Sequence, residues 1–169
     1  MSTVQAKSVP APSASSMDNP LREFIRVQGL LERVMQAYFA RFGISGSQWG
    51  LLRILHRAEQ DGQSGLRLTD LSDRLLIRLP SVTGAVDRLE RAGLVARDHA
   101  ALDHRSKFVG LTKKGRQLIE RILAVHEKQV TKVLGGLSWK EQAEFQRLLR
   151  LLGQHLETLI ARGYEVNEG

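Results

Sequence analysis

A stripe of small polar residues followed by arginines runs along the segment that begins at Pro80. At 100° of rotation per residue, one face of a helix here would turn to the core and carry Val82, Ala85, Val86 and Leu89. The opposite face would carry Ser81, Gly84, Arg88 and Arg91, with Thr83 and Asp87 at its border. Small residues permit close approach, a helix start favours a phosphate, and Arg and Thr reach base edges. The pattern indicates DNA contact in a major groove, and an ordinary solvated helix face is the alternative.

Positive charge is concentrated around this segment. The 169 residues include 25 Lys and Arg against 18 Asp and Glu, a formal net charge of +7. Residues 67–116 hold eleven of the basic and six of the acidic side chains, so most of the excess is central. Such a surface can displace counterions from a nucleic acid backbone, and we add Arg78 and Lys107 to the expected DNA contacts.

A polar loop after the stripe is a second candidate for DNA contact. It joins two extended runs, 94–97 and 107–111, and contains Asp103, His104 and Arg105. An arginine at the tip of a hairpin can enter a minor groove, and Asp103 is close enough in sequence to hold its guanidinium. The alternative is a polar turn with a local ion pair that contributes little.

The elements that must position these residues are short and are separated by tight turns. We expect a short helix before residue 77, a turn over 77–79, and a second helix that Pro80 opens and Gly93 ends. A hairpin follows, and helix, turn, helix, hairpin is the order of a winged helix-turn-helix.

Long amphipathic segments flank this central module. Apolar residues recur with helical spacing from residue 21 to 42, after Thr112, and after the capping-box pair Ser138 and Glu141. Ser45 and Gln48 have the same spacing before a helix in between. We therefore predict a mainly α fold with a small β-hairpin wing. Its divisions are a disordered Ser- and Pro-rich tail at 1–19, dimerisation helices at 20–44 and 112–162, and a DNA-binding domain at 45–111.

Composition restricts the chemistry. Without cysteine the chain has no disulfide, thiolate ligand or thiol-based redox sensing. Its five histidines show no metal-binding spacing, and no catalytic or phosphate-binding motif is present, so we expect no metal, no cofactor and no enzymatic activity. No apolar run approaches the length of a membrane helix, and no secretion signal is evident, which predicts a cytoplasmic protein without a membrane partner.

Three stretches resemble a known family. LTDLSDRLLIRLPSVTGAVDRLERAGLVAR and DHRSKFVGLTKKGR are similar to the winged helix-turn-helix of the multiple antibiotic resistance regulator (MarR) family, and ISGSQWGLLRIL to its second helix. The resemblance covers residues 21–160. It implies a homodimer with one recognition helix per protomer in consecutive major grooves of an inverted repeat. It also implies recognition contacts from Ser81, Thr83, Gly84 and Arg88, with Asp103 and Arg105 as the wing pair and Arg105 as the minor-groove probe.

The family resemblance also bears on regulation. Members respond to small aromatic or phenolic acids or to cysteine oxidation, and this chain has no cysteine. Candidate ligand contacts near the expected cleft are Tyr38, Phe42, Trp49 and His56, although aromatic residues at helical spacing are also typical of a core. Gly50 stands where the urate-responsive branch has an acidic residue, which disfavours urate.

We therefore expect a sequence-specific DNA-binding transcriptional regulator that represses from palindromic operators as a dimer and is released by a small aromatic or phenolic ligand. An additional role as an activator stays open. One alternative is an architectural DNA-binding protein with little sequence preference. Another is a winged-helix module that binds a protein.

Overall fold

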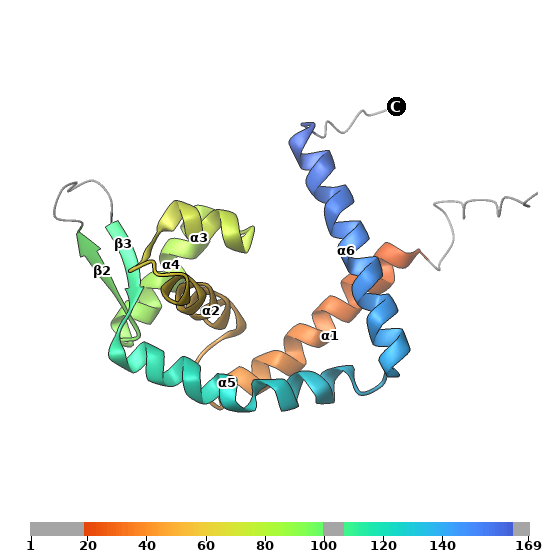
Figure 1. Ribbon diagram of the computed structural model, residues 1–169, viewed down its shortest axis with the longest axis horizontal. Coiled ribbons are helices and arrows are strands. Elements are labelled where there is room, and N and C mark those ends of the chain that lie inside the picture. The colour runs from red at the N-terminus through yellow and green to blue at the C-terminus, as the bar shows by residue number, and fades with distance from the viewer. Residues whose placement is uncertain (1–18, 100–106, 164–169) are drawn as a thin grey trace, which may run out of the picture. The chain divides into compact units, whose positions relative to one another are not determined.

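The structure is a computed structural model that describes residues 19–99 and 107–163 of the chain. It divides into two compact units, Met1–Glu120 and Arg121–Gly169. The described residues form six helices and a three-stranded antiparallel sheet (Figure 1). The mainly α fold class with a β wing is thereby confirmed.

Two helices open the first unit. Helix α1, Pro20–Ala40, begins after Asn19, whose side chain accepts a hydrogen bond from Leu21 N at 2.9 Å. Helix α2, Gly46–Gln60, begins at the predicted capping box: Gln48 N donates to Ser45 Oγ, and Ser45 N donates to Gln48 Oε1. These reciprocal bonds satisfy two amides that a helix start would otherwise leave unpaired.

The helix-turn-helix follows. Helix α3, Leu68–Leu75, ends at Leu76 in the left-handed conformation (φ 54°), and helix α4, Leu79–Arg91, starts one residue before the predicted Pro80. The predicted inner face of α4 is confirmed, because Val82, Ala85, Val86 and Leu89 are all buried. They belong to a core shared with side chains of α2, α3 and α5, among them Leu51, Leu52, Leu55, Leu71 and Ile119.

The wing strands lie close to their predicted positions. Strand β2, Val95–His99, pairs antiparallel with β3, Lys107–Leu111, with Arg97 opposite Val109. A third strand, β1, was not predicted from the sequence; its two residues, Leu66–Arg67, pair with the other edge of β3. A strand of two residues is too short to show the alternation by which strands are recognised.

The second unit contains most of α5, Lys113–Leu134, and all of α6, Trp139–Ala161. The predicted capping box at Ser138 and Glu141 is confirmed, with Glu141 N donating to Ser138 Oγ and Ser138 N donating to Glu141 Oε2. Within residues 19–99 and 107–163, no helix is long and apolar enough to cross a membrane.

Candidate nucleic acid interface

The outer face of α4 presents the predicted combination of small residues and arginines. Ser81, Arg88 and Arg91 are exposed, while Thr83 and Gly84 are half-buried. The Thr83 hydroxyl donates a hydrogen bond to Leu79 O, a backbone carbonyl in the first turn of the helix, at 3.0 Å. Arg88 folds back over Gly84: a Cβ built on the glycine would lie 3.6 Å from Arg88 Nη1. Because Gly84 has no side chain, the backbone of α4 is accessible at this point, and the guanidinium of Arg88 lies beside it.

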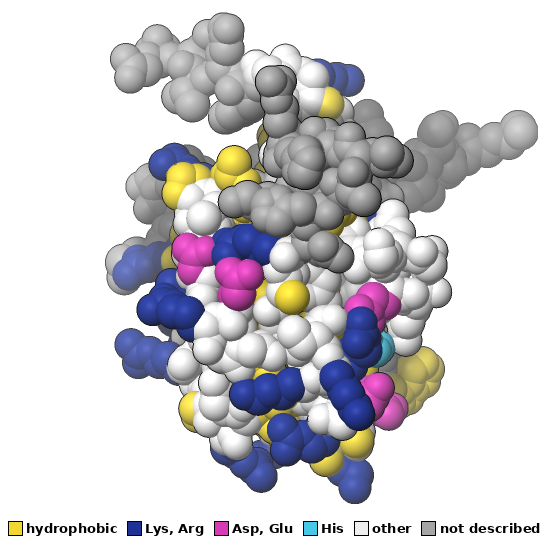
Figure 2. All heavy atoms as spheres, turned by 90° about the vertical axis from the view of Figure 1, so that its left-hand side faces the viewer, with side chains coloured by type: hydrophobic (Ala, Val, Ile, Leu, Met, Phe, Trp, Pro, Cys, Tyr) yellow, Lys and Arg dark blue, Asp and Glu magenta, His cyan; other side chains and the backbone are white. Residues whose placement is uncertain are grey.

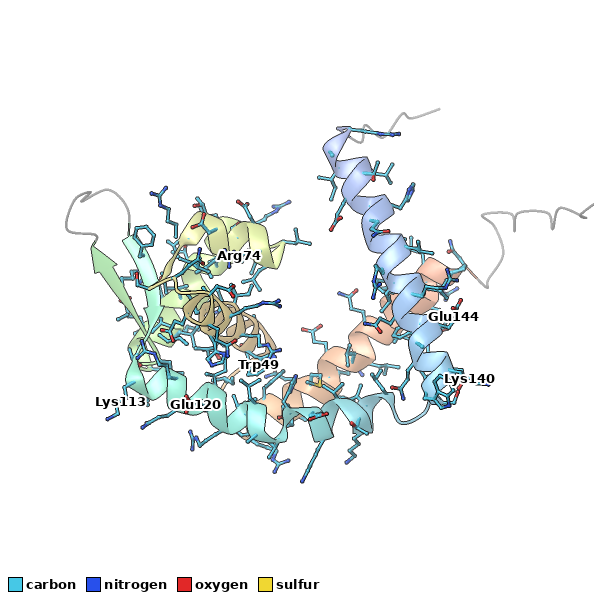
Figure 3. The ribbon with its side chains drawn as sticks, viewed as in Figure 1. Trp49, Arg74, Lys113, Glu120, Lys140 and Glu144 are labelled. Carbon is cyan, nitrogen blue, oxygen red and sulfur yellow. The ribbon has the colours of Figure 1, made fainter. Side chains whose placement is uncertain are left out.

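Basic residues also flank the turn that leads into α4. Arg78 is the residue before the helix, and its carbonyl accepts hydrogen bonds from Ser81 N at 2.9 Å and Val82 N at 3.2 Å. Its side chain is exposed, as is that of Arg74 in the last turn of α3 (Figure 3). Arg78 thus lies at the start of α4, where the helix dipole also favours an anion.

The wing contacts remain predictions. Asp103 and Arg105 lie outside the described residues. The backbone of Lys107 pairs with His99 at the start of β3, but its side chain is also outside the description.

A contact that sequence reasoning missed holds the C-terminal end of α4 against the start of α5. Thr112 Oγ1 donates to Gly93 O at 2.7 Å, Thr112 N to Leu94 O at 3.1 Å, and Lys114 Nζ to Ala92 O at 2.8 Å. Thr112 also caps α5 by accepting from Gly115 N at 3.0 Å. We call these residues the α4–α5 joint. It occupies carbonyls at the helix end that would otherwise lack a partner.

Sequence reasoning also missed an ion-pair network between α4 and the wing. Arg97 on β2 donates from Nη2 to Asp87 Oδ1 and from Nη1 to Glu90 Oε2. Its backbone N–H donates to Glu90 Oε1 at 3.3 Å. Burial disfavours the charged guanidinium, but the hydrogen bond to Asp87 and the attraction of both carboxylates outweigh it, so the pKa of Arg97 lies above its ordinary value. We call this set the Arg97 bridge.

The surface around these elements is predominantly basic. Figure 2, which faces the end of the molecule that bears the wing strands and the start of α5, shows more Lys and Arg side chains than acidic ones. Exposed basic residues here include Lys113, Lys114 and Arg116. Arg116 is also fixed to α2, because its Nε and Nη2 each donate to Glu59 at 2.9 Å.

Three of the four candidate ligand residues lie in one aromatic cluster with Phe39. The Trp49 ring stacks on Phe39 at 5.3 Å, and Tyr38 contacts Phe42 edge-on at 5.4 Å. Tyr38 is buried, which raises the pKa of its phenol, while Trp49 and Phe42 are partly exposed. Arg53 lies over the Trp49 ring, 5.9 Å from its centroid, and His56 follows two turns after Trp49 along α2.

Comparison with known proteins identifies the family. Residues 42–106 match the sequence profile of the MarR family. An uncharacterised HTH-type transcriptional regulator of Bacillus subtilis, YkoM, is 31% identical over 121 residues, which are 71% of this chain and 75% of YkoM. The chain therefore belongs to the MarR family. The transcriptional repressor YetL of the same bacterium is 30% identical over 75% of this chain and 74% of its own.

Membership in the MarR family makes the chain a DNA-binding transcriptional regulator. A solved structure with the same fold is Bordetella bronchiseptica BpsR, described with the regulation of its DNA binding by 6-hydroxynicotinic acid. It is 24% identical, has a TM-score of 0.72, and covers 85% of this chain and 98% of its own. Among the described residues, no group of three or more His, Asp or Glu is placed to hold a metal ion.

Proposed function

We propose that this MarR-family protein represses transcription as a homodimer by placing α4 of each protomer in consecutive major grooves of an inverted-repeat operator. The observation that carries the proposal is the division of α4 into two faces. Its inner face is fully buried, whereas Ser81, Gly84 and Arg88 lie on the accessible outer face. Small residues allow the backbone to approach base edges, and arginine is the commonest reader of guanine.

Binding to the intergenic DNA upstream of the protein's own reading frame tests this proposal, because such regulators often control neighbouring genes. We expect binding that persists in excess unrelated DNA of equal length, with a footprint of two protected segments about one helical turn apart. Binding that unrelated DNA removes equally well would support the architectural alternative. Absence of binding even at low salt would contradict DNA recognition and favour a protein-interaction module.

Two apolar helix faces support the dimer. In α6 the apolar residues recur on one face and are 39% to 73% exposed: Phe145, Leu148, Leu149, Leu152, Leu156 and Ile160. Helix α1 has apolar side chains 44% to 60% exposed, among them Leu21, Phe24, Ile25, Leu31 and Val34. Apolar surfaces of this extent are typical of an interface with another chain, and we propose that a second copy covers both.

A charge on the apolar face of α6 is expected to dissociate the dimer. Leu152→Glu would bury an unpaired carboxylate at the interface, which should raise the dimer dissociation constant about a hundredfold. Light scattering over a dilution series measures this constant. Gln154→Glu, exposed on the opposite side of α6, is the matched control and should leave the mass at two chains. A wild-type mass of one chain at all concentrations would contradict the dimer.

We also propose a small aromatic acid as the effector, bound beside the aromatic cluster. Trp49 and Phe42 offer partly exposed rings, and Arg53 offers a cation for a carboxylate. The relative BpsR, whose DNA binding 6-hydroxynicotinic acid regulates, supports this ligand class. Such a ligand releases DNA only if it binds the DNA-incompetent arrangement more tightly than the DNA-bound one.

The effector is tested by adding 6-hydroxynicotinic acid and simple phenolic acids to the protein–DNA complex. We expect release of DNA together with a change in Trp49 fluorescence, measured in a Trp139→Phe background that removes the other tryptophan. Benzylamine is the control, because it keeps the ring but reverses the charge. Release without any response of Trp49 would place the ligand elsewhere, and no release would leave DNA binding intact but contradict this effector class.

A further inference from the structure

The Arg97 bridge joins the two elements from which DNA contacts are proposed, α4 and the wing. Arg97 lies on β2, two residues before the end of that strand. Its two carboxylate partners, Asp87 and Glu90, are three positions apart on α4 and therefore lie one above the other on the same side of the helix. One guanidinium thus spans a turn of α4.

The geometry of the bridge fixes the strand in more than one direction. Glu90 accepts from both the backbone N–H and the side chain of Arg97, so strand and side chain are tied to the same carboxylate. Asp87 binds the other terminal nitrogen. The Arg97 side chain is only 18% exposed, against 47% for Asp87 and 38% for Glu90, so the arginine is the enclosed member. Lysine carries a single point charge and cannot reproduce this two-branched contact.

The bridge also changes the charge of the DNA-facing helix. Asp87 precedes Arg88 directly at the border of the outer face of α4, and the carboxylates of Asp87 and Glu90 are both partly exposed. Two free carboxylates at this place would repel the phosphate backbone. With Arg97 paired to both, their combined charge is reduced and their oxygens are turned to the strand.

We propose that Arg97 is a positioning residue for DNA recognition, which holds the wing strand β2 on α4 and compensates Asp87 and Glu90. The inference rests on the proposed function, since it assigns no DNA contact to Arg97 itself. Its effect should appear in the ratio of the affinities for operator and for unrelated DNA, because this ratio depends on how accurately α4 and the wing are placed together.

The variants Arg97→Lys, Arg97→Met and Asp87→Asn/Glu90→Gln test the proposal in the full-length protein. We expect Arg97→Lys to lower the specificity ratio about tenfold, in line with couplings within ion-pair networks. Asp87→Asn/Glu90→Gln removes two negative charges and should bind unrelated DNA more tightly, yet its specificity ratio should also fall. The control Arg147→Met removes an ion pair within α6, that with Glu144, and should leave the ratio unchanged.

A second readout needs no DNA. Amide hydrogen exchange in β2 and β3 should accelerate about tenfold in the Arg97 variants, relative to reference amides of α2. This measurement tests the Arg97 bridge independently of the proposed function. A wild-type protein without preference for its operator would contradict the proposed function. Unchanged exchange rates in the Arg97 variants would contradict the proposal that Arg97 holds the wing strand on α4. Faster exchange with an unchanged specificity ratio would make Arg97 structural only and contradict its role in recognition.

The salt dependence of binding distinguishes positioning from direct contact. If Arg97 bound a phosphate, Arg97→Met would reduce the slope of log affinity against log salt by about one and weaken both duplexes equally. We expect the slope to stay at the wild-type value. If Arg97→Met does not fold, Arg97→Lys and the double carboxamide variant, which preserve the size of each side chain, decide the question.

Discussion

Replacing Arg88 with alanine is expected to weaken operator binding about thirtyfold, because a bidentate arginine contact to a base contributes about 1–3 kcal/mol of discrimination. Arg88 is exposed on α4, where its guanidinium lies over Gly84. Fluorescence anisotropy with operator and unrelated duplexes measures the change. Binding of unrelated DNA should fall much less, since backbone charge dominates it.

Arg57→Ala is the matched control, since Arg57 is an exposed arginine in the last turn of α2. It should change both affinities by less than about twofold. Equal losses on both duplexes in Arg88→Ala would make Arg88 a phosphate contact. Wild-type affinity in Arg88→Ala would show that the outer face of α4 is only solvated.

Gly84→Ala tests the same face of α4 without changing its charge. Among the described residues, the new methyl group would meet only the flexible Arg88 side chain, so the helix of the free protein should tolerate it and gain about 0.5–1 kcal/mol of stability. On the operator, the same methyl group would stand between α4 and the bases. A variant that melts higher but binds the operator more weakly would locate the close approach at Gly84.

Gly115→Ala is expected to destabilise the fold by about 3 kcal/mol, the upper end of the usual cost of overpacking, because the atom that a new methyl group would meet belongs to the backbone. A Cβ at this position would lie 2.0 Å from Leu94 O, a backbone atom in the α4–α5 joint, so the chain itself must shift. The melting temperature should fall by about 10 °C, as measured by circular dichroism.

Gly46→Ala is the control for this prediction. Gly46 is the first residue of α2, and a Cβ there would have its nearest neighbour, Phe39 Cδ2, at an ordinary 4.0 Å. Its melting temperature should stay within about 2 °C of wild type. If the melting temperature of Gly115→Ala equalled that of Gly46→Ala, the end of α4 would not be held as closely by α5 as the joint indicates.

Helical periodicity and capping chemistry carried most of the fold prediction. The inner face of α4 follows from 3.6-residue spacing alone, and the boxes at Ser45 and Ser138 place two helix starts correctly. Pro80 is tolerated in the first turn of a helix, and the structure uses it at the second position, after Leu79. Leu66–Arg67 form a strand because they pair with β3, which lies more than forty residues away in the sequence. The local sequence therefore gives no signal for this strand.

The parts of the interface that sequence reasoning missed depend on tertiary contacts. Arg97, Asp87 and Glu90 are all visible in the sequence, but their pairing requires β2 to return along α4. Two acidic residues three apart on a DNA-facing helix are a usable signal, because they need a compensating cation nearby. Gly115, near the start of a helix, offers a similar signal: glycine there is unfavourable unless another backbone approaches closely.

The central claim is that α4 reads a DNA sequence, and selection of binding sites from a randomised duplex pool tests it without reference to any genome. After several rounds with the purified full-length protein, we expect enrichment of an inverted repeat whose half-sites are centred about 10 base pairs apart. The same selection with Arg88→Ala should lose base preference at defined positions in each half-site. A bound pool that stays random in sequence, round after round, would contradict sequence-specific recognition by this protein.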